Sequence, residues 1–415
     1  MKFLATVAVC LAAYGATKDV AKVTAPAKPV AAAPLDPFVQ QGVDWLIQAQ
    51  HPDGGWGAGS HANQQQRDPH LVVTDPATTS FVAMALVRAG STPASGPQQA
   101  ALKRATLYLL DAVERAPEAG PQITDIQGTQ PQAKLGPLVD TGLTSQYLAR
   151  VLPTLAVGSP LHTRVDKALD KCLRKLQGSQ LADGSWGTGR GWAPVLQSSV
   201  STSALEMAQA AGKVVEADKL DRARAYQKSN YAASPAPGGA ASGMAGSAGV
   251  ELYALTSAQR AGAREAAEAV DVMQEAKDKG RLPASAPMTE ENLKRAGVDP
   301  KKAQALNDAY NARNAQLRRL ADDELLRGFG SNGGEEYLSY LQTSESLVIA
   351  GGKEWDAWKS KMSARLSKIQ SQDGSWTGHH CITSPVFCTA AVLQTLTADR
   401  DSGELRRSTQ VAQRR

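Results

Sequence analysis

Apolar residues along the chain recur with the period of an α-helix, and the helical segments come in pairs. In each pair, an amphipathic segment is followed after a turn by a second apolar segment. Side chains three and four residues apart lie on one helix face, so this spacing predicts helices that pack by that face. The second segments occupy residues 78–90, 139–152, 198–212, 247–259, 333–352 and 386–396.

Three of the turns between paired helices carry one motif. The stretches WLIQAQHPDGGWG (45–57), LRKLQGSQLADGSWG (173–187) and LSKIQSQDGSWTG (366–378) each end a helix with glutamine and continue to Asp-Gly-x-Trp. Glycine ends a helix and permits a tight turn, aspartate bonds its own backbone two residues on, and tryptophan seals one helix pair against the next. We therefore assign structural roles to Gln48, Asp53, Trp56, Gln177, Asp183, Trp186, Gln370, Asp373 and Trp376.

Six helical hairpins over residues 36–398 predict an all-α fold, an (α/α)6 toroid. In this fold the second helices form an inner ring and the first helices form an outer ring. A hairpin with its loops needs about 50 to 60 residues, so residues 260–314 are an excess that we interpret as a helical insertion. Asp299 and Pro300 form a good helix start, and we expect a long helix from there into the fifth outer helix.

The two ends of the chain differ in composition from this repeat region. Residues 1–16 combine one lysine, an apolar run and small residues, which is the pattern of an export signal. The run is too short to span a bilayer. Residues 17–35 are rich in Ala, Pro and Lys and are typical of a flexible linker, whereas residues 399–415 form a basic tail that we expect to be disordered. We therefore expect a periplasmic or extracellular protein without a transmembrane span, with a membrane tether as the alternative.

The amino-acid composition limits the kinds of partner that we expect. Of the net charge of +5, much lies in the C-terminal tail, and the rest of the chain mixes both signs, so we predict no nucleic-acid partner. The chain has 5 Phe, 7 Trp and 9 Tyr in 415 residues, too few to line a hydrocarbon cavity that stabilises cations.

The repeated Gln…Asp-Gly-x-Trp motif resembles the QW repeat of squalene–hopene cyclases. The wider resemblance is to the squalene-cyclase and prenyltransferase repeat superfamily, which also includes complement-type thioester domains and which implies an α/α toroid. The resemblance covers nearly all of residues 36–398. This fold hosts unrelated activities, so function has to be argued from the site.

The signatures of the activities known in that superfamily are missing or altered. No DxDD motif, with which the cyclases protonate an alkene, occurs in the sequence. The prenyltransferase zinc pair Asp-x-Cys has Asp140 followed by Gly142, and Cys388 lies roughly where the zinc-binding histidine would be. At the thioester motif, NGGEEY (332–337) has Gly333 in place of the cysteine and Glu336 in place of the glutamine.

Polar residues gather in the loops that precede the inner helices. Because the inner helices of a toroid are parallel, these loops meet on one face, where helix N-termini also present free N–H groups. The inner-face polar residues are His61, His70, Asp75 and Asp140, and those of the last two repeats are Glu335, Glu336, His379, His380, Cys381 and Cys388.

These residues admit three interpretations. Cys388, His380 and Cys381 are candidate metal ligands, with zinc as the metal and Glu335 or Glu336 as further donors. His379, His380, Glu335 and Glu336 are candidate catalytic acid–base groups. The structural interpretation assigns the acidic residues to helix N-termini and pairs Cys381 with Cys388 in a disulfide, which an oxidising compartment permits.

From these features we predict an exported toroid with a binding or scaffold role and no catalysis. Its partner would be a protein or a hydrophobic, isoprenoid-like ligand, held in the central cavity or on the face that carries the inner-helix N-termini. The alternative is a divergent terpenoid-cyclase-like or prenyltransferase-like enzyme acting on an isoprenoid or other lipid-like substrate.

Overall fold

A computed structural model describes residues 33–187, 193–232, 248–328 and 333–406, and Leu35–Arg415 form one compact unit. The predicted export signal and nearly all of the predicted linker lie outside the described residues. The described part is helical and contains no β-strand, apart from two isolated bridges. None of the described helices is long and apolar enough to cross a membrane.

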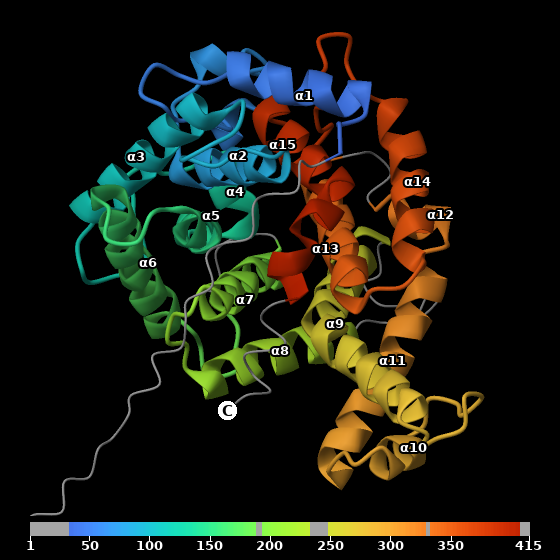
Figure 1. The fold of residues 1–415 in the computed structure, drawn as a ribbon. Helices are drawn as coiled ribbons and strands as arrows, with labels where there is room; N and C mark the ends of the chain where they lie inside the picture. The colour runs from blue at the N-terminus through green and yellow to red at the C-terminus, as the bar shows by residue number, and fades with distance from the viewer. Residues whose placement is uncertain (1–32, 188–192, 233–247, 329–332, 407–415) are drawn as a thin grey trace, which may run out of the picture. The chain divides into compact units, whose positions relative to one another are not determined.

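Six helices form a closed inner ring, in which each contacts the next and the last contacts the first (Figure 1). They are α2 (Pro76–Arg88), α5 (Val139–Val151), α7 (Pro194–Ala210), α9 (Ala248–Asp278), α13 (Gly334–Ala350) and α15 (Pro385–Leu396). The outer helices are α1 (Pro37–Gln48), α3 (Gln99–Arg115), α6 (Pro160–Gly178), α8 (Ala217–Ala232), α11 (Pro300–Arg319) with the short α12 (Asp323–Leu326), and α14 (Glu354–Ser367). The predicted (α/α)6 toroid is confirmed.

The inner and outer helices differ in burial, as their sequences predict. Every residue of α5 and of α15 is buried, because these helices have neighbours on all sides. An outer helix such as α6 buries only one stripe, which includes Val165, Leu169 and Leu176. The core of the protein is therefore continuous between the two rings.

The three Asp-Gly-x-Trp turns share one geometry. Each tryptophan is fully buried, and its indole N–H donates to a carbonyl near the end of the preceding outer helix at 2.7–2.8 Å. Each aspartate accepts from the N–H two residues on. The donor and acceptor pairs of the indoles are Trp56 with Leu46, Trp186 with Leu176, and Trp376 with Leu366.

The glutamine that bonds the turn is not the predicted one in the first two copies of the motif. Gln50, Gln180 and Gln370 each donate to the carbonyl of the turn glycine and to a carbonyl of the next outer helix. This bonding role therefore falls on Gln50 and Gln180 in the first two copies, and not on Gln48 and Gln177. The reason is that the glutamine must stand three residues before the aspartate to reach both carbonyls.

The third turn closes the ring. Gln370 donates to the Phe38 carbonyl at 2.8 Å, and the indole N–H of Trp45 donates to Asp373 at 3.0 Å. Gly374 has φ 92°, and a Cβ there would lie 2.9 Å from the Gln41 carbonyl oxygen, so only glycine permits this approach. The last repeat is thus fastened to the first helix by the same contacts that join internal repeats.

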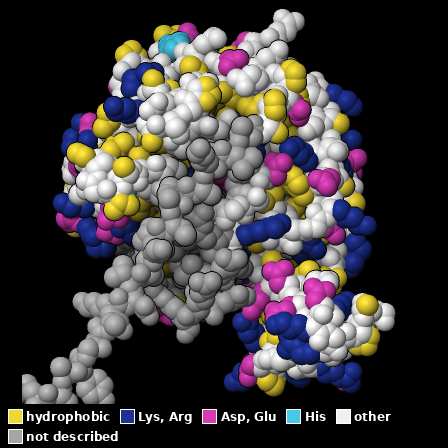
Figure 2. Space-filling model, viewed as in Figure 1, with side chains coloured by type: hydrophobic (Ala, Val, Ile, Leu, Met, Phe, Trp, Pro, Cys, Tyr) yellow, Lys and Arg dark blue, Asp and Glu magenta, His cyan; other side chains and the backbone are white. Residues whose placement is uncertain are grey.

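The insertion has other boundaries than predicted. Helix α9 runs without a break from the inner ring to Asp278, so the first part of residues 260–314 extends the fourth inner helix. This extension, α10 (Glu290–Arg295) and α11 enclose a small apolar cluster of their own. Figure 2 shows the resulting lobe covered by mixed charges. The helix that begins after Asp299 ends at Arg319, and a turn at Leu320–Asp322 separates it from α12.

The disordered tail was predicted to begin at residue 399, but the chain is ordered beyond that point. Ala398–Asp401 form a turn of 3-10 helix, Ala398 and Asp401 are buried, and Leu405 packs into the core. Packing against the ring therefore continues to at least Leu405. Residues 407–415 lie outside the described residues.

We predict that replacing Gln50 lowers the free energy of unfolding more than replacing Gln48 does. Gln50→Ala removes the donor to two carbonyls and should lower the free energy of unfolding by about 1–3 kcal/mol. Gln48 is exposed, so Gln48→Ala should change it by less than about 0.5 kcal/mol. Chemical denaturation of both variants measures the difference, and equal losses would contradict the assignment.

Candidate functional site

The start of α13 and the loop before α15 meet at one mouth of the inner ring. The Gly334 N–H donates to the Ile382 carbonyl at 3.0 Å, and a Cβ on Gly334 would lie 2.6 Å from the Ile382 side chain. A Cβ on Gly333 would lie 3.0 Å from the His380 ring. The two glycines therefore let the His-His-Cys loop lie directly on the helix start.

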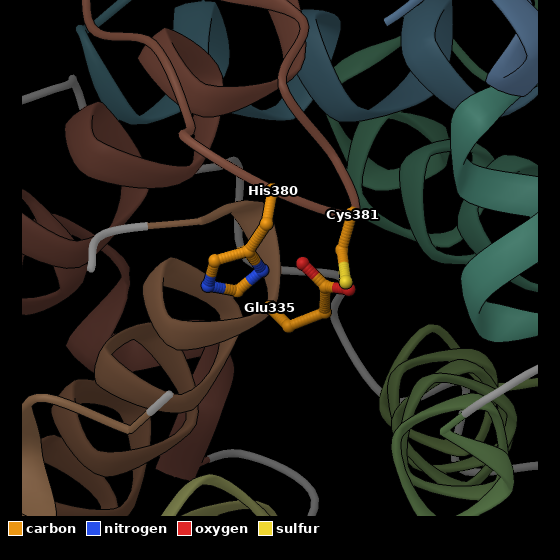
Figure 3. A group of neighbouring side chains, drawn as sticks. All are labelled: Glu335, His380 and Cys381. Atoms are coloured by element: carbon orange, nitrogen blue, oxygen red, sulfur yellow. The ribbon is translucent and has the colours of Figure 1, made fainter. Parts of the chain in front are cut away.

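Within this contact, the Glu335 carboxylate, the His380 imidazole and the Cys381 thiol converge (Figure 3). One ligand atom from each residue lies within 4.8 Å of the others. Glu335 is buried, whereas His380 and Cys381 are half-buried. Cys381 has φ 62°, the one positive φ at a residue other than glycine among the described residues. This left-handed conformation costs roughly 1–2 kcal/mol, and it turns the thiol towards Glu335.

Glu336 forms the second acidic side of the site. It is fully buried and accepts from the Gly333 N–H at 3.0 Å. The His380 Nε2 lies 3.7 Å from its carboxylate, and the Tyr253 hydroxyl donates to it at 3.4 Å. His380 therefore lies between two carboxylates from one helix turn.

Sequence reasoning missed two residues of this mouth, both on α4 (Gln130–Leu135). Lys134 is buried and hydrogen-bonds the Cys381 thiol. Gln130 accepts from the N–H groups of Thr383 and Ser384 at 2.7 and 3.0 Å. The available signal was the capping box of Thr129 and Gln132, which marks a short helix between the second pair of helices.

Burial governs the electrostatics of the site. It raises the pKa of Glu335 above its ordinary value, and the neighbouring charge of Glu336 raises it further. Burial and the charge of Glu335 raise the pKa of Cys381 to about 11. The thiol is therefore protonated at neutral pH unless a metal ion takes the place of the proton.

The structure does not bring the other histidines into this group. His379 is exposed. His61 accepts or donates through Nδ1 with Gln64, and burial and the charge of Lys134 lower its pKa. His70 is exposed, and its ring lies 5.5 Å from that of His51. His61 is thus at the edge of the mouth, and His70 belongs to a separate surface pair.

Asp75 and Asp140 form a second, separate acidic group. Both are fully buried, and main-chain N–H groups donate to both. Asp75 caps α2 through Thr78, and Asp140 joins α5 to α2 through the Ala77 N–H at 3.0 Å. These contacts support a structural role for the pair, in fastening two inner helices together.

The cysteines do not form the disulfide that was predicted between Cys381 and Cys388. Cys172, Cys381 and Cys388 are all free. Cys388 lies fully buried on α15, and its thiol donates to the Ile382 carbonyl at 3.4 Å. Cys388 is also absent from the convergent group, in which Glu335 stands beside His380 and Cys381. The predicted metal set is therefore altered in one ligand.

The fold and the turns define the class of protein, a toroid of repeated helical hairpins sealed by buried tryptophans. Residues 13–120 match the family model described as squalene-hopene cyclase C-terminal domain. The match includes α1, the first Asp-Gly-x-Trp turn, α2 and α3, and it supports membership of the squalene-cyclase and prenyltransferase-like superfamily. No curated protein and no solved structure matches the chain.

The buried Asp75–Asp140 pair predicts a fall in stability with rising pH. Burial raises the pKa of Asp75 to about 6, and burial with the charge of Asp75 raises that of Asp140 to about 7. The folded state therefore holds protons that the unfolded state releases near pH 4, and stability is lost as pH rises through 6 to 7. We expect a loss of about 4 kcal/mol between pH 5 and 8, since Asp75 stays protonated in the folded state for about one pH unit above 5 and Asp140 for about two.

Denaturation as a function of pH measures this loss. Asp140→Asn removes one of the two interacting charges and should make the decline markedly shallower. A stability that rises over this range, or a slope that Asp140→Asn leaves as it was, would contradict the prediction.

The convergent group predicts a zinc site at the mouth. Zinc accepts sulfur, nitrogen and carboxylate ligands, and three protein ligands leave a fourth position open. We expect one zinc per chain, with affinity that rises with pH because the Cys381 proton must leave. Cys381→Ser and Glu335→Gln should each weaken binding at least about tenfold.

Cys388→Ala is the matched control, because Cys388 lies outside the group and should leave the zinc content unchanged. Metal analysis and competition with a chromophoric chelator give the stoichiometry and the affinity. Protein that binds no stoichiometric zinc, or that loses it equally on Cys388→Ala, would rule this site out.

Proposed function

We propose that this protein is a non-catalytic binding toroid, whose partner binds at the mouth that carries Glu335, His380 and Cys381 and not in the centre of the ring. The observation that carries the proposal is a buried ion network across the ring. Arg88 of α2 pairs with Glu345 of α13, although α15 lies between these helices. Side chains of helices that are not neighbours thus meet, which narrows the ring at that level.

The rest of the ring interior supports the same proposal. The hydroxyls of Ser80 and Thr144 hydrogen-bond at 2.9 Å where α2 meets α5. Ser257 donates to Gln342 at 3.2 Å where α9 meets α13. An isoprenoid chain threaded between these groups would leave buried polar atoms without partners, at about 1–3 kcal/mol for each.

Helix α4 also supports a role at the mouth. Its contacts to Cys381, Thr383 and Ser384 carry it over the inner-helix N-termini, so a long substrate would have to displace it. His380 and Cys381 are half-buried there, so a metal ion or a polar segment of a partner protein can reach them from solvent. Export remains part of the proposal, supported by the pattern of residues 1–16, and cell fractionation tests it.

The second candidate is a divergent enzyme. One observation favours it, the position of His380 at 3.7 Å from Glu336, because such a pair can move a proton. In that case His380 would act as the acid–base group, and Glu336 would orient it and stabilise its charge.

We predict that the protein neither binds nor converts isoprenoids. Squalene and farnesyl diphosphate, incubated with the full chain with and without zinc, should be recovered unchanged, and a fluorescent farnesyl probe should show no saturable binding. The polar contacts between the inner helices and the absence of a DxDD motif from the sequence are the reasons.

Turnover that Glu336→Gln abolishes, at an unchanged melting temperature, would overturn the binding proposal in favour of the enzyme. His379→Ala is the matched control for that experiment, because this histidine is exposed and adjacent but outside the cluster.

A further inference from the structure

The opposite end of the inner ring is lined by buried arginines. Arg260 pairs with Glu206 at 2.8 Å and with Glu345 at 3.0 Å, and Arg264 pairs with Glu206 at 3.2 Å. Four arginines at this end are each less than a tenth exposed, and the ring itself supplies two buried glutamates against them. The four are Arg88, Arg150, Arg260 and Arg264.

A third buried carboxylate comes from outside the repeats. Asp401 follows the last inner helix and forms ion pairs with both Arg88 and Arg150. The next turn of the same segment brings the Leu405 carbonyl within 2.8 Å of an Arg264 nitrogen that donates to it. Residues 398–406 therefore lie over the arginine end of the ring as an added segment.

The arginines keep unused binding capacity even with this segment in place. Arg150 Nε and Arg260 Nη2 are buried and have no hydrogen-bond partner among the described residues. A cavity of about 20 Å³ lies beside Arg150 and Arg264, and Glu404 and Leu405 of the added segment also line it. Burial lowers the pKa of Arg150 to about 9 and that of Arg264 to about 10, and a neighbouring arginine lowers each further while glutamates oppose the shift.

The shape of the guanidinium groups limits the ligands that the arginine end of the ring can bind. Guanidinium groups present planar forks of N–H donors that match the oxygens of carboxylate and phosphate. The forks of Arg88 and Arg150 already converge on one carboxylate, that of Asp401. The segment itself follows the repeats and buries only three side chains, Ala398, Asp401 and Leu405, so it can leave while the ring stays closed.

We propose that the arginine cluster is a binding site for an oxyanion, a phosphate or a carboxylate group, and that Asp401 occupies it as an internal ligand. An external oxyanion then binds by displacing residues 398–406. The arginine cluster shares no residue with the mouth that carries Glu335, His380 and Cys381, although its Arg88–Glu345 pair also supports the proposal that partners do not bind in the centre of the ring.

Hydrogen exchange on the full chain tests displacement directly. Inorganic phosphate, compared with sodium chloride at equal ionic strength, should increase amide exchange in residues 398–406 severalfold and leave the Asp-Gly-x-Trp turns unchanged. Acetate serves as the carboxylate arm. An effect of both anions indicates a general oxyanion site, and an effect of one alone identifies its class.

Asp401→Asn keeps the shape of the internal ligand and removes its charge. It should tighten phosphate binding at least tenfold, measured by calorimetry and by the rise in melting temperature, and Arg150→Gln in that background should abolish the gain. Asp399→Asn is the matched control, because Asp399 pairs with Lys359 away from the arginines.

Two results would overturn the proposal. One is phosphate binding no tighter in Asp401→Asn than in Asp399→Asn. The other is unchanged exchange of residues 398–406 in the unmodified protein at saturating phosphate, which decides the matter even if the Asp401 variant fails to fold.

Discussion

The structure depends on one contact, the insertion of a tryptophan and its turn between one helical hairpin and the next. The indole is buried, and its N–H donates to a carbonyl of the preceding outer helix. The turn glycine lies against the backbone of the following outer helix. A hairpin cannot bury its apolar faces alone, so each one needs this neighbour. When the sixth hairpin makes the same contact with α1, through Gln370 and Phe38, no hairpin is left with an open side.

Closure of the ring creates two ends with different chemistry. At the N-terminal end, helix starts hold carboxylates, with a histidine, a thiol and the short helix α4 above them. At the other end, Arg88 and Arg150 occupy the last turns of α2 and α5, where the helix dipole favours cations, and Arg260 and Arg264 reach the same place from the middle of α9. Between these ends, the inner helices bury hydroxyls, amides and ion pairs.

The sequence and the structure agree where an argument rests on local spacing and diverge where it rests on long-range approach. Helical periodicity places all six inner helices, because burial on a helix face is a property of residues three and four apart. The sequence does not distinguish Gln48 from Gln50, because both lie near the end of the helix and before the turn. Only the position of the next outer helix, to which Gln50 donates, selects Gln50. Lys134 and Asp401 were missed because their partners lie hundreds of residues away or across the ring.

The sequence by itself determined the repeat, the all-α class and the face on which polar loops gather, since each follows from short-range patterns of burial and turn chemistry. Only the tertiary structure decided which of those polar residues meet. It joined Glu335 to His380 and Cys381 and left Cys388 apart, because the two glycines at the start of α13 let the loop lie directly against the helix start. It also converted an expected tail into part of the core, because the arginine end of the ring requires a further carboxylate and Asp401 is within reach.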